Sequence, residues 1–173
     1  MADDAVCDSR RMAAEYDAKP REIRNFAIVQ LALTAGFLAL LVWMFDAVDA
    51  DPPPVWQWVV LLGAVAVGGL LAERVWLAAD PLPPHTDDPT STALAIYAGQ
   101  TVRRLAICEV PILLGIGFAF LTDHAAWPVL IAGVPGLVVL AIEIWPSGRH
   151  LSLTETVLDG AGARTRLLES FDA

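Results

Sequence analysis

The chain has 173 residues, of which 56% are hydrophobic, and its mean hydropathy is +0.56. This is far more apolar surface than a soluble domain of this length can bury in one core, so the composition excludes an ordinary soluble globular protein. The formal charge of −9 argues against nucleic acid as a partner.

The chain opens with an acidic segment, residues 1–24, whose first residues lack the apolar core of a signal peptide. An apolar run follows at 25–46 and is too long for a signal sequence, so we expect it to be retained as a membrane helix. A second apolar run covers 55–78. Both come near the roughly 20 residues that a helix needs to cross the hydrocarbon layer.

Two further membrane helices are predicted at 104–122 and 126–146. Pro111 and Pro135 interrupt the backbone hydrogen bonding of these helices and predict a kink in each. The sequence therefore predicts an all-α, polytopic membrane protein in which residues 25–146 form a bundle of four transmembrane helices.

The remaining segments are short. The loop at 79–103 begins with a Pro-, Asp- and Thr-rich linker, and Ala93–Thr101 is expected to extend the third helix into the cytoplasm. In the tail, residues 147–173, Ser152 and Glu155 have the spacing of a capping box at a helix start.

Later in the tail, Gly160 and Gly162 are expected to stop that helix. A second stretch places Leu167, Leu168 and Phe171 on one side, which predicts contact with the membrane surface or with a partner.

The positive charges predict the orientation of the chain. All eleven lysines and arginines lie in the N-terminal segment, at the middle loop or in the tail, and the other two loops have none. The positive-inside rule therefore places both termini and the middle loop in the cytoplasm. Ten arginines against one lysine, with abundant alanine, indicate a GC-rich bacterial genome and hence a bacterial plasma membrane.

The tryptophans agree with this orientation, because amphipathic indole rings prefer the membrane interface. The six tryptophans fall at the ends of the predicted helices, with Trp43, Trp56, Trp58 and Trp127 at outer ends and Trp76 and Trp145 at inner ends.

The same topology brings polar side chains to one level near the cytoplasmic surface. This inner-leaflet polar cluster comprises Arg24, Gln30, Glu73, Arg74, Arg103, Arg104, Glu109 and Glu143. Charged groups inside a membrane pair with one another. We therefore expect Glu109 to pair with Arg24 or Arg103, and Arg74 to pair with Glu143.

Three interpretations of the cluster stay open. In the first, the cluster is a belt of ion pairs and hydrogen bonds that locks the helix register. In the second, it is a proton or cation site built on a protonatable carboxylate. In the third, it contacts lipid headgroups or a partner protein.

An internal alignment suggests that the bundle is two tandem two-helix hairpins. The stretch that begins at Arg24 aligns with the stretch that begins at Arg103, and this places Gln30 opposite Glu109. In the second and fourth helices a glycine precedes a glutamate, Glu73 or Glu143, by ten residues. Small residues that allow close helix packing include Gly36, Gly63, Gly68, Gly115, Gly133 and Gly136.

Neither cysteine nor histidine predicts a cofactor. Cys7 lies in the cytoplasmic segment and Cys108 inside the membrane, so a disulfide is not expected. The three histidines fall in three separate loops, and we predict neither a metal site nor a bound cofactor.

The stretches "RRLAICEVPILLGIGFAF" and "IEIWPSGRHLSLTETVLDGAGARTRL" resemble a set of small uncharacterised four-helix integral membrane proteins of actinobacteria. The match lies in the part of the chain that follows residue 102. It implies the four-helix membrane fold and brings no known activity.

Three functions of different classes follow. The first is a non-catalytic subunit or assembly factor of a larger bacterial membrane complex, of the respiratory chain or the cell envelope, in contact with lipids and with other membrane subunits or copies of itself. The second is a small proton- or ion-coupled carrier that uses Glu109. The third, a membrane enzyme, is disfavoured because no nucleophile and base pair, metal cluster or phosphate loop is present.

Overall fold

The computed structural model describes residues 19–45 and 51–172. The predictions made for Cys7, for the positive charges of Arg10 and Arg11 in the N-terminal segment, and for residues 46–50 of the loop between the first two membrane helices lie outside these residues. The described residues form helices and no strand. The helices are α2 (Pro20–Phe45), α3 (Val55–Trp76), α4 (Pro89–Leu121), α5 (Trp127–Ile144), α6 (Gly148–Leu158), the 3-10 turn η1 (Asp159–Ala161) and α7 (Leu167–Asp172).

Four of these helices, α2 to α5, are long and apolar enough to cross a membrane. The shortest, α5, has 18 residues and spans about 27 Å at 1.5 Å per residue, close to the thickness of the hydrocarbon layer. The all-α fold with four membrane-spanning helices that the sequence predicts is therefore confirmed, and the chain is a multi-pass membrane protein.

Two of the four membrane helices begin several residues before their predicted starts, and the other bounds agree to within two residues. Helix α4 begins at Pro89, so the extension expected at Ala93–Thr101 is helical and starts four residues earlier. Helix α2 begins at Pro20, within the segment predicted to precede it. Pro111 and Pro135 lie inside α4 and α5 and end neither helix.

The chain divides into two compact units. The bundle consists of Phe26–Arg74 and Arg103–Trp145, and the small unit consists of 19–25, Val75–Val102 and 146–172 among the described residues. The sequence treats the parts of the small unit as a leading segment, a loop and a tail. The structure instead assembles them around one core.

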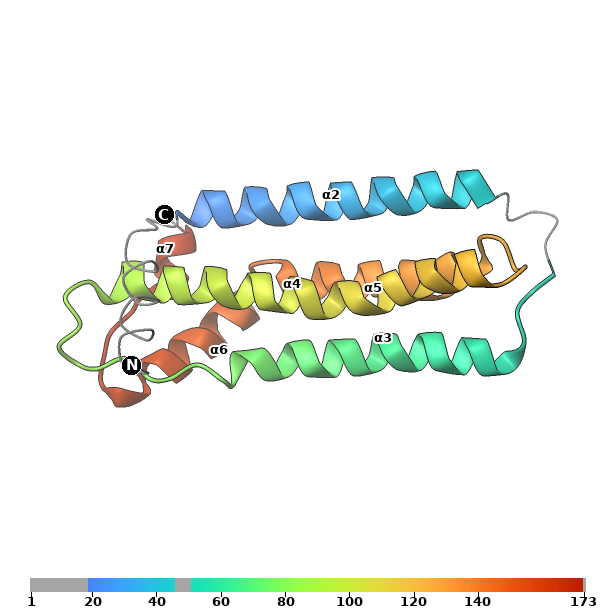
Figure 1. Cartoon of the computed structure of the whole chain (residues 1–173). Coiled ribbons are helices and arrows are strands. Elements are labelled where there is room, and N and C mark those ends of the chain that lie inside the picture. Colours follow the sequence, from blue (N-terminus) through green and yellow to red (C-terminus); the bar gives the residue numbers. More distant parts are fainter. Residues whose placement is uncertain (1–18, 46–50, 173) are drawn as a thin grey trace, which may run out of the picture. The chain divides into compact units, whose positions relative to one another are not determined.

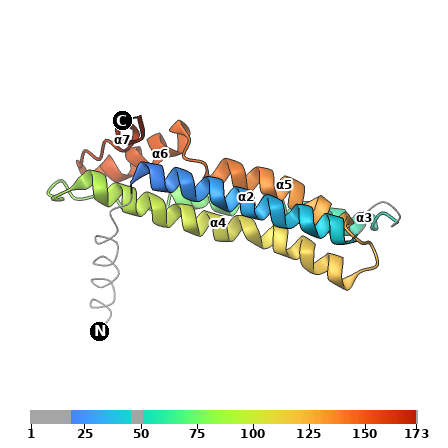
Figure 2. The ribbon, with the colours of Figure 1, turned by 90° about the horizontal axis from the view of Figure 1, so that it is seen from above.

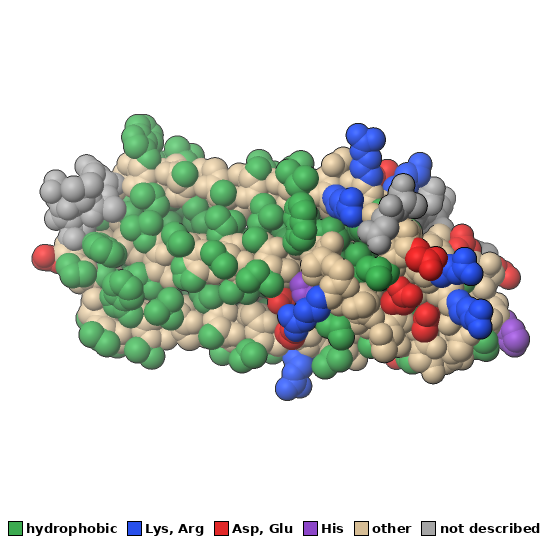
Figure 3. All heavy atoms as spheres, turned by 180° about the vertical axis from the view of Figure 1, so that it is seen from behind, with side chains coloured by type: hydrophobic (Ala, Val, Ile, Leu, Met, Phe, Trp, Pro, Cys, Tyr) green, Lys and Arg blue, Asp and Glu red, His purple; other side chains and the backbone are tan. Residues whose placement is uncertain are grey.

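In the bundle, α2 to α5 run side by side, with α4 and α5 between α2 and α3 (Figures 1 and 2). A buried cluster drawn from all four helices holds them together; it includes Ala27, Leu41, Ala72, Ile112 and Leu140. Hydrophobic side chains also cover the visible outer face of the bundle (Figure 3). Such a surface suits hydrocarbon and not water.

The core of the small unit is aromatic. Trp76 stacks on His150, with ring centroids 4.7 Å apart, and lies 5.4 Å from the ring of Tyr97. Tyr97 in turn meets Phe171 of α7 edge to face at 5.8 Å. Trp76 is the last residue of α3, at the helix end where the sequence predicts it, and it is 2% exposed inside this core, so its indole packs against protein side chains.

Two predictions for the tail are also corrected. Ser147, not Ser152, is the N-cap of α6, and its hydroxyl oxygen accepts from the backbone N–H of His150 at 3.4 Å. Ser152 lies within the helix and donates to the carbonyl of Arg149. Leu167 and Phe171 are buried in the core of the small unit, so α7 does not offer them to a membrane or a partner.

Gly162 ends the 3-10 turn that follows α6, and its φ of +98° explains the glycine, because other residues rarely adopt this left-handed conformation. The loop before α4 and the first turn of α4 are each tied to the tail by one hydrogen bond. The Leu82 N–H donates to the carbonyl of Leu158 at 2.8 Å, and the Thr90 hydroxyl donates to the carbonyl of Thr165 at 2.8 Å.

Candidate functional site

The first polar contact inside the bundle joins α2 to α4. Gln30 donates from Nε2 to Oε1 of Glu109 at 2.7 Å. The partner of the Glu109 carboxylate is therefore the amide of Gln30, and not Arg24 or Arg103 as the sequence predicts. The reason is helix register, because Gln30 sits at the level of Glu109 on a neighbouring helix and reaches it with a short side chain.

The second polar group joins α3, α4 and α5. Arg104 is completely buried and donates from its guanidinium to the backbone carbonyl of Glu143. Carboxylate oxygens of Glu73 and Glu143 lie within 4.8 Å of each other. Glu143 is buried and Glu73 is half-buried, so this group places two acids and one guanidinium where α3, α4 and α5 meet.

The predicted pairing of Arg74 with Glu143 is not observed. Arg74 is exposed and has no ion-pair partner among the described residues. The arginine that approaches Glu143 is Arg104, because the register of α4 turns this side chain inward and leaves its neighbour Arg103 exposed.

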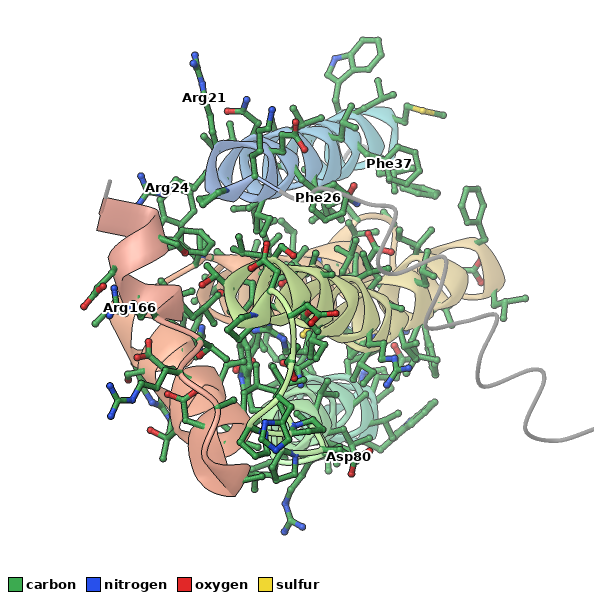
Figure 4. All side chains as sticks on the ribbon, turned by 90° about the vertical axis from the view of Figure 1, so that its left-hand side faces the viewer. Arg21, Arg24, Phe26, Phe37, Asp80 and Arg166 are labelled. Carbon is green, nitrogen blue, oxygen red and sulfur yellow. The ribbon has the colours of Figure 1, made fainter. Side chains whose placement is uncertain are left out.

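Arg24 belongs to the small unit and lies on the side of α2 that faces α7, whereas Arg21 points away from the chain (Figure 4). The Arg24 guanidinium donates to the backbone carbonyl of Phe171 at 3.0 Å and sits 5.7 Å from the centre of the Phe171 ring. Arg24 therefore holds the end of α7, and the partner of its guanidinium is this carbonyl and not the predicted Glu109.

Four of the six predicted packing glycines lie where helices approach closely. A Cβ placed on Gly115 would come within 2.6 Å of the Ala132 Cβ, and one on Gly136 within 2.7 Å of an Ile112 side-chain carbon. Gly133 has Leu38 of α2 at 2.9 Å. These contacts fix the approach of α4 and α2 to α5.

Gly68 has Pro111 of α4 at 3.0 Å, which fixes the approach of α3 to α4. The remaining two glycines are different, because a Cβ on Gly36 or Gly63 would meet nothing within 4 Å. In the internal alignment Gly36 corresponds to Gly115, yet only Gly115 is packed.

Sequence reasoning missed the contact between Trp76 and His150. A histidine that stands alone in its segment predicts no site, and a tryptophan at a helix end indicates the membrane interface. Nothing in a single sequence indicates that the end of α3 and the start of α6 meet. The mixed polar and apolar pattern of α6 indicates that this helix packs on a small core, but it does not indicate which residues complete that core.

No protein family, curated protein or solved structure matches this chain. The geometry of the described residues is therefore the basis for a function.

Proposed function

We propose that the chain is a non-catalytic subunit or assembly factor of a larger bacterial membrane complex, of the respiratory chain or the cell envelope. It lies in the plasma membrane with both termini and the middle loop in the cytoplasm, as the distribution of positive charges favours. The membrane-spanning fold supports the membrane location. One feature of α2 supports the role as a subunit that binds another membrane protein.

That feature is the open face of α2. Only 11% of the residues in its apolar stretch are buried, against 50% in α5. Ala32, Gly36 and Ala39 recur along one side of the helix, where both alanines are exposed and a Cβ on Gly36 would meet nothing within 4 Å. Small residues let helix backbones approach, which is how Gly115 is used inside the bundle, so Gly36 provides a place for a helix from another chain.

A matched pair of variants tests this proposal. A Cβ on Gly36 or Gly63 meets nothing within 4 Å, so we expect Gly36→Leu and Gly63→Leu to leave the packing of the monomer intact. The tagged chain is purified from its native membranes in digitonin, and its partners are quantified by mass spectrometry and native electrophoresis. We expect the wild-type chain to purify in a complex larger than the monomer. Gly36→Leu should reduce recovery of the partner roughly tenfold, which corresponds to a loss of about 1.4 kcal/mol in binding free energy.

Gly63→Leu is expected to retain the partner. A wild-type chain that purifies as a lone monomer contradicts the proposal, and so does equal loss of the partner in the two variants.

A second function, a proton- or ion-coupled carrier, is favoured by the two acids of α3 and α5. Carboxylate oxygens of the half-buried Glu73 and the buried Glu143 lie within 4.8 Å of each other. Carboxylates inside membrane helices commonly serve proton and ion pathways, and a close pair of them can pass on a proton or a cation.

The test of this function is flux in proteoliposomes. Glu143→Gln should abolish a proton or cation flux that Glu169→Gln, on the exposed surface of α7, leaves intact. Glu109→Gln is the third arm, since the sequence names Glu109 as the carrier residue. Flux that is unchanged in both Glu109→Gln and Glu143→Gln excludes the carrier.

A further inference from the structure

One contact between α3 and α4 determines which of their side chains lie on the same side of the helix pair. Gly68 of α3 meets Pro111 of α4, with 3.0 Å from a Cβ on Gly68 to the proline Cγ. The next residues along the chain, Gly69 and Ile112, both turn toward α5: Val139 lies near Gly69, and Gly136 lies near Ile112. Helix α5 therefore covers one side of the α3 and α4 pair.

The opposite side of this pair is open. Val67 and Val110 are the residues before Gly68 and Pro111, so they point away from α5, and both are exposed. The helical repeat places Leu71 and Leu114 on the same side, four residues further on, and they are exposed as well. We call these residues, with the two arginines described next, the α3–α4 face.

Two arginines complete this face at one end. Arg74 is seven residues after Val67, and Arg103 is seven residues before Val110, so two helical turns bring each onto the same side as its valine. Because the helices are antiparallel, both lie toward the same end of the bundle. From the Gly68 and Pro111 contact, Arg74 is about 9 Å and Arg103 about 12 Å along, so they share a level to within about 3 Å.

No residue in the described part of the chain neutralises either guanidinium. Both side chains are exposed, and neither has an ion-pair partner among the described residues. An arginine at the border of the hydrocarbon layer needs an anionic or hydrogen-bonding partner, and its planar fork matches a phosphate group. Directly beside them the face is apolar, which suits acyl chains and does not suit a free anion.

We propose that the α3–α4 face binds one anionic phospholipid. Its phosphate lies between Arg74 and Arg103, and its acyl chains lie along Val67, Leu71, Val110 and Leu114. The charge of the two arginines and the apolar surface beside them match the two parts of such a lipid. This site is independent of the partner proposed for α2.

The test measures lipid retention on the full chain. Protein in a neutral detergent is titrated with phosphatidylglycerol or with phosphatidylcholine, and bound lipid is counted by native mass spectrometry. We expect one tightly retained phosphatidylglycerol per chain and no such retention of phosphatidylcholine. Arg74→Gln with Arg103→Gln should weaken phosphatidylglycerol binding about thirtyfold, the loss that corresponds to about 1 kcal/mol for each arginine.

The matched control is Arg21→Gln with Arg164→Gln, which removes the same charge from exposed positions of the small unit. It should bind phosphatidylglycerol as the wild type does. Equal losses in the two double variants, or equal binding of the two lipids by the wild type, would overturn the proposal. Competition by millimolar inorganic phosphate would also overturn it, since it would identify an anion site without acyl contacts.

A second measurement keeps both arginines in place. A photo-crosslinking amino acid at Leu71 should capture phosphatidylglycerol from mixed vesicles in preference to phosphatidylcholine. The same probe at Leu33, an exposed residue of α2, should capture the two lipids in the proportion supplied. Capture of a second copy of the chain at Leu71, or capture of lipid without preference there, contradicts the proposal.

Discussion

Individual polar side chains of the bundle find partners on the neighbouring helix at their own level. Glu109 accepts from the amide of Gln30, and the guanidinium of Arg104 donates to a backbone carbonyl on α5. In hydrocarbon no water replaces a missing partner, so each such contact holds one helix against another. Because α2 buries little of its apolar surface, the hydrogen bond from Gln30 contributes a large part of the interaction that holds α2 against α4.

Gln30→Leu should therefore destabilise the protein by about 1–2 kcal/mol, because it leaves the Glu109 carboxylate without its donor. Adding Glu109→Leu should restore most of the loss, since both polar groups are then gone. The measurement is reversible unfolding by SDS titration in mixed micelles.

The control for this prediction is Thr34→Val, one turn further along α2, where a polar group is removed from a position that makes no described bond to another helix. It should change stability by less than about 0.5 kcal/mol. A double variant that is less stable than Gln30→Leu alone would show that the two side chains do not act as a pair.

Sequence reasoning located these polar residues but chose wrong partners for them. The levels of Gln30 and Glu109 follow from counting residues, because every residue advances a helix by a fixed rise. Whether Arg74 or Arg104 turns toward Glu143 depends on how each helix is rotated about its own axis. That rotation is set by contacts such as Gly68 with Pro111, which one sequence does not reveal.

Among the helices, α7 is the one most dependent on its surroundings. It has six residues, too few for a helix that is stable alone. Glu155 of α6 accepts from the backbone N–H of Leu168 at 2.9 Å and so caps the first turn of α7. At the other end Arg24 donates to the carbonyl of Phe171.

Glu155→Ala should remove the cap at a cost of about 1 kcal/mol and raise the hydrogen-exchange rate of residues 167–172 roughly fivefold. Glu169→Ala is the comparison, since this exposed acid makes only a surface ion pair with Arg166 at 4.0 Å. Equal exchange in the two variants would mean that packing of Leu167 and Phe171 alone holds the helix.

The long helices were predictable because length and apolar composition are local properties, and the short ones were not. Ser152 with Glu155 has the spacing of a helix start, yet the helix begins at Gly148, directly after Pro146 and Ser147. Pro146 breaks the preceding helix and Ser147 caps the next, which is an equally regular local pattern. Choosing between two such starts requires the contacts that bury Leu151 and Leu158.

On the scale of the whole molecule, the small unit is the part that sequence reasoning did not find. Its core combines Ile23, Trp76, Tyr97 and Leu167, which come from four places far apart in the chain. Each segment taken alone is too short and too polar to predict a core. Only the sum of their apolar residues, brought together by the fold, buries enough surface to be stable.

The proposed orientation predicts which positions a reagent outside the cell can reach. In a chain with Cys7→Ser and Cys108→Ala, a cysteine at Asp51 or Asp123 should react with a membrane-impermeant maleimide in intact cells. A cysteine at Asp87 or Glu169 should react only after the membrane is opened. All four positions are exposed on the protein, so reactivity reports the side of the membrane.

Labelling of Asp87→Cys in intact cells would reverse the orientation and place the small unit outside. Labelling at Asp51 but not at Asp123 would mean that α4 and α5 do not cross as a pair.

The composite origin of the small unit fixes an order of events during biosynthesis. Leu167 and Phe171 follow all four membrane helices in the chain, and both belong to the core that also contains Ile23 and Trp76. Those earlier residues leave the ribosome with their final neighbours still untranslated. The nascent protein must therefore keep apolar surface available, shielded by lipid or a chaperone, until the last membrane helix has been inserted and α7 arrives.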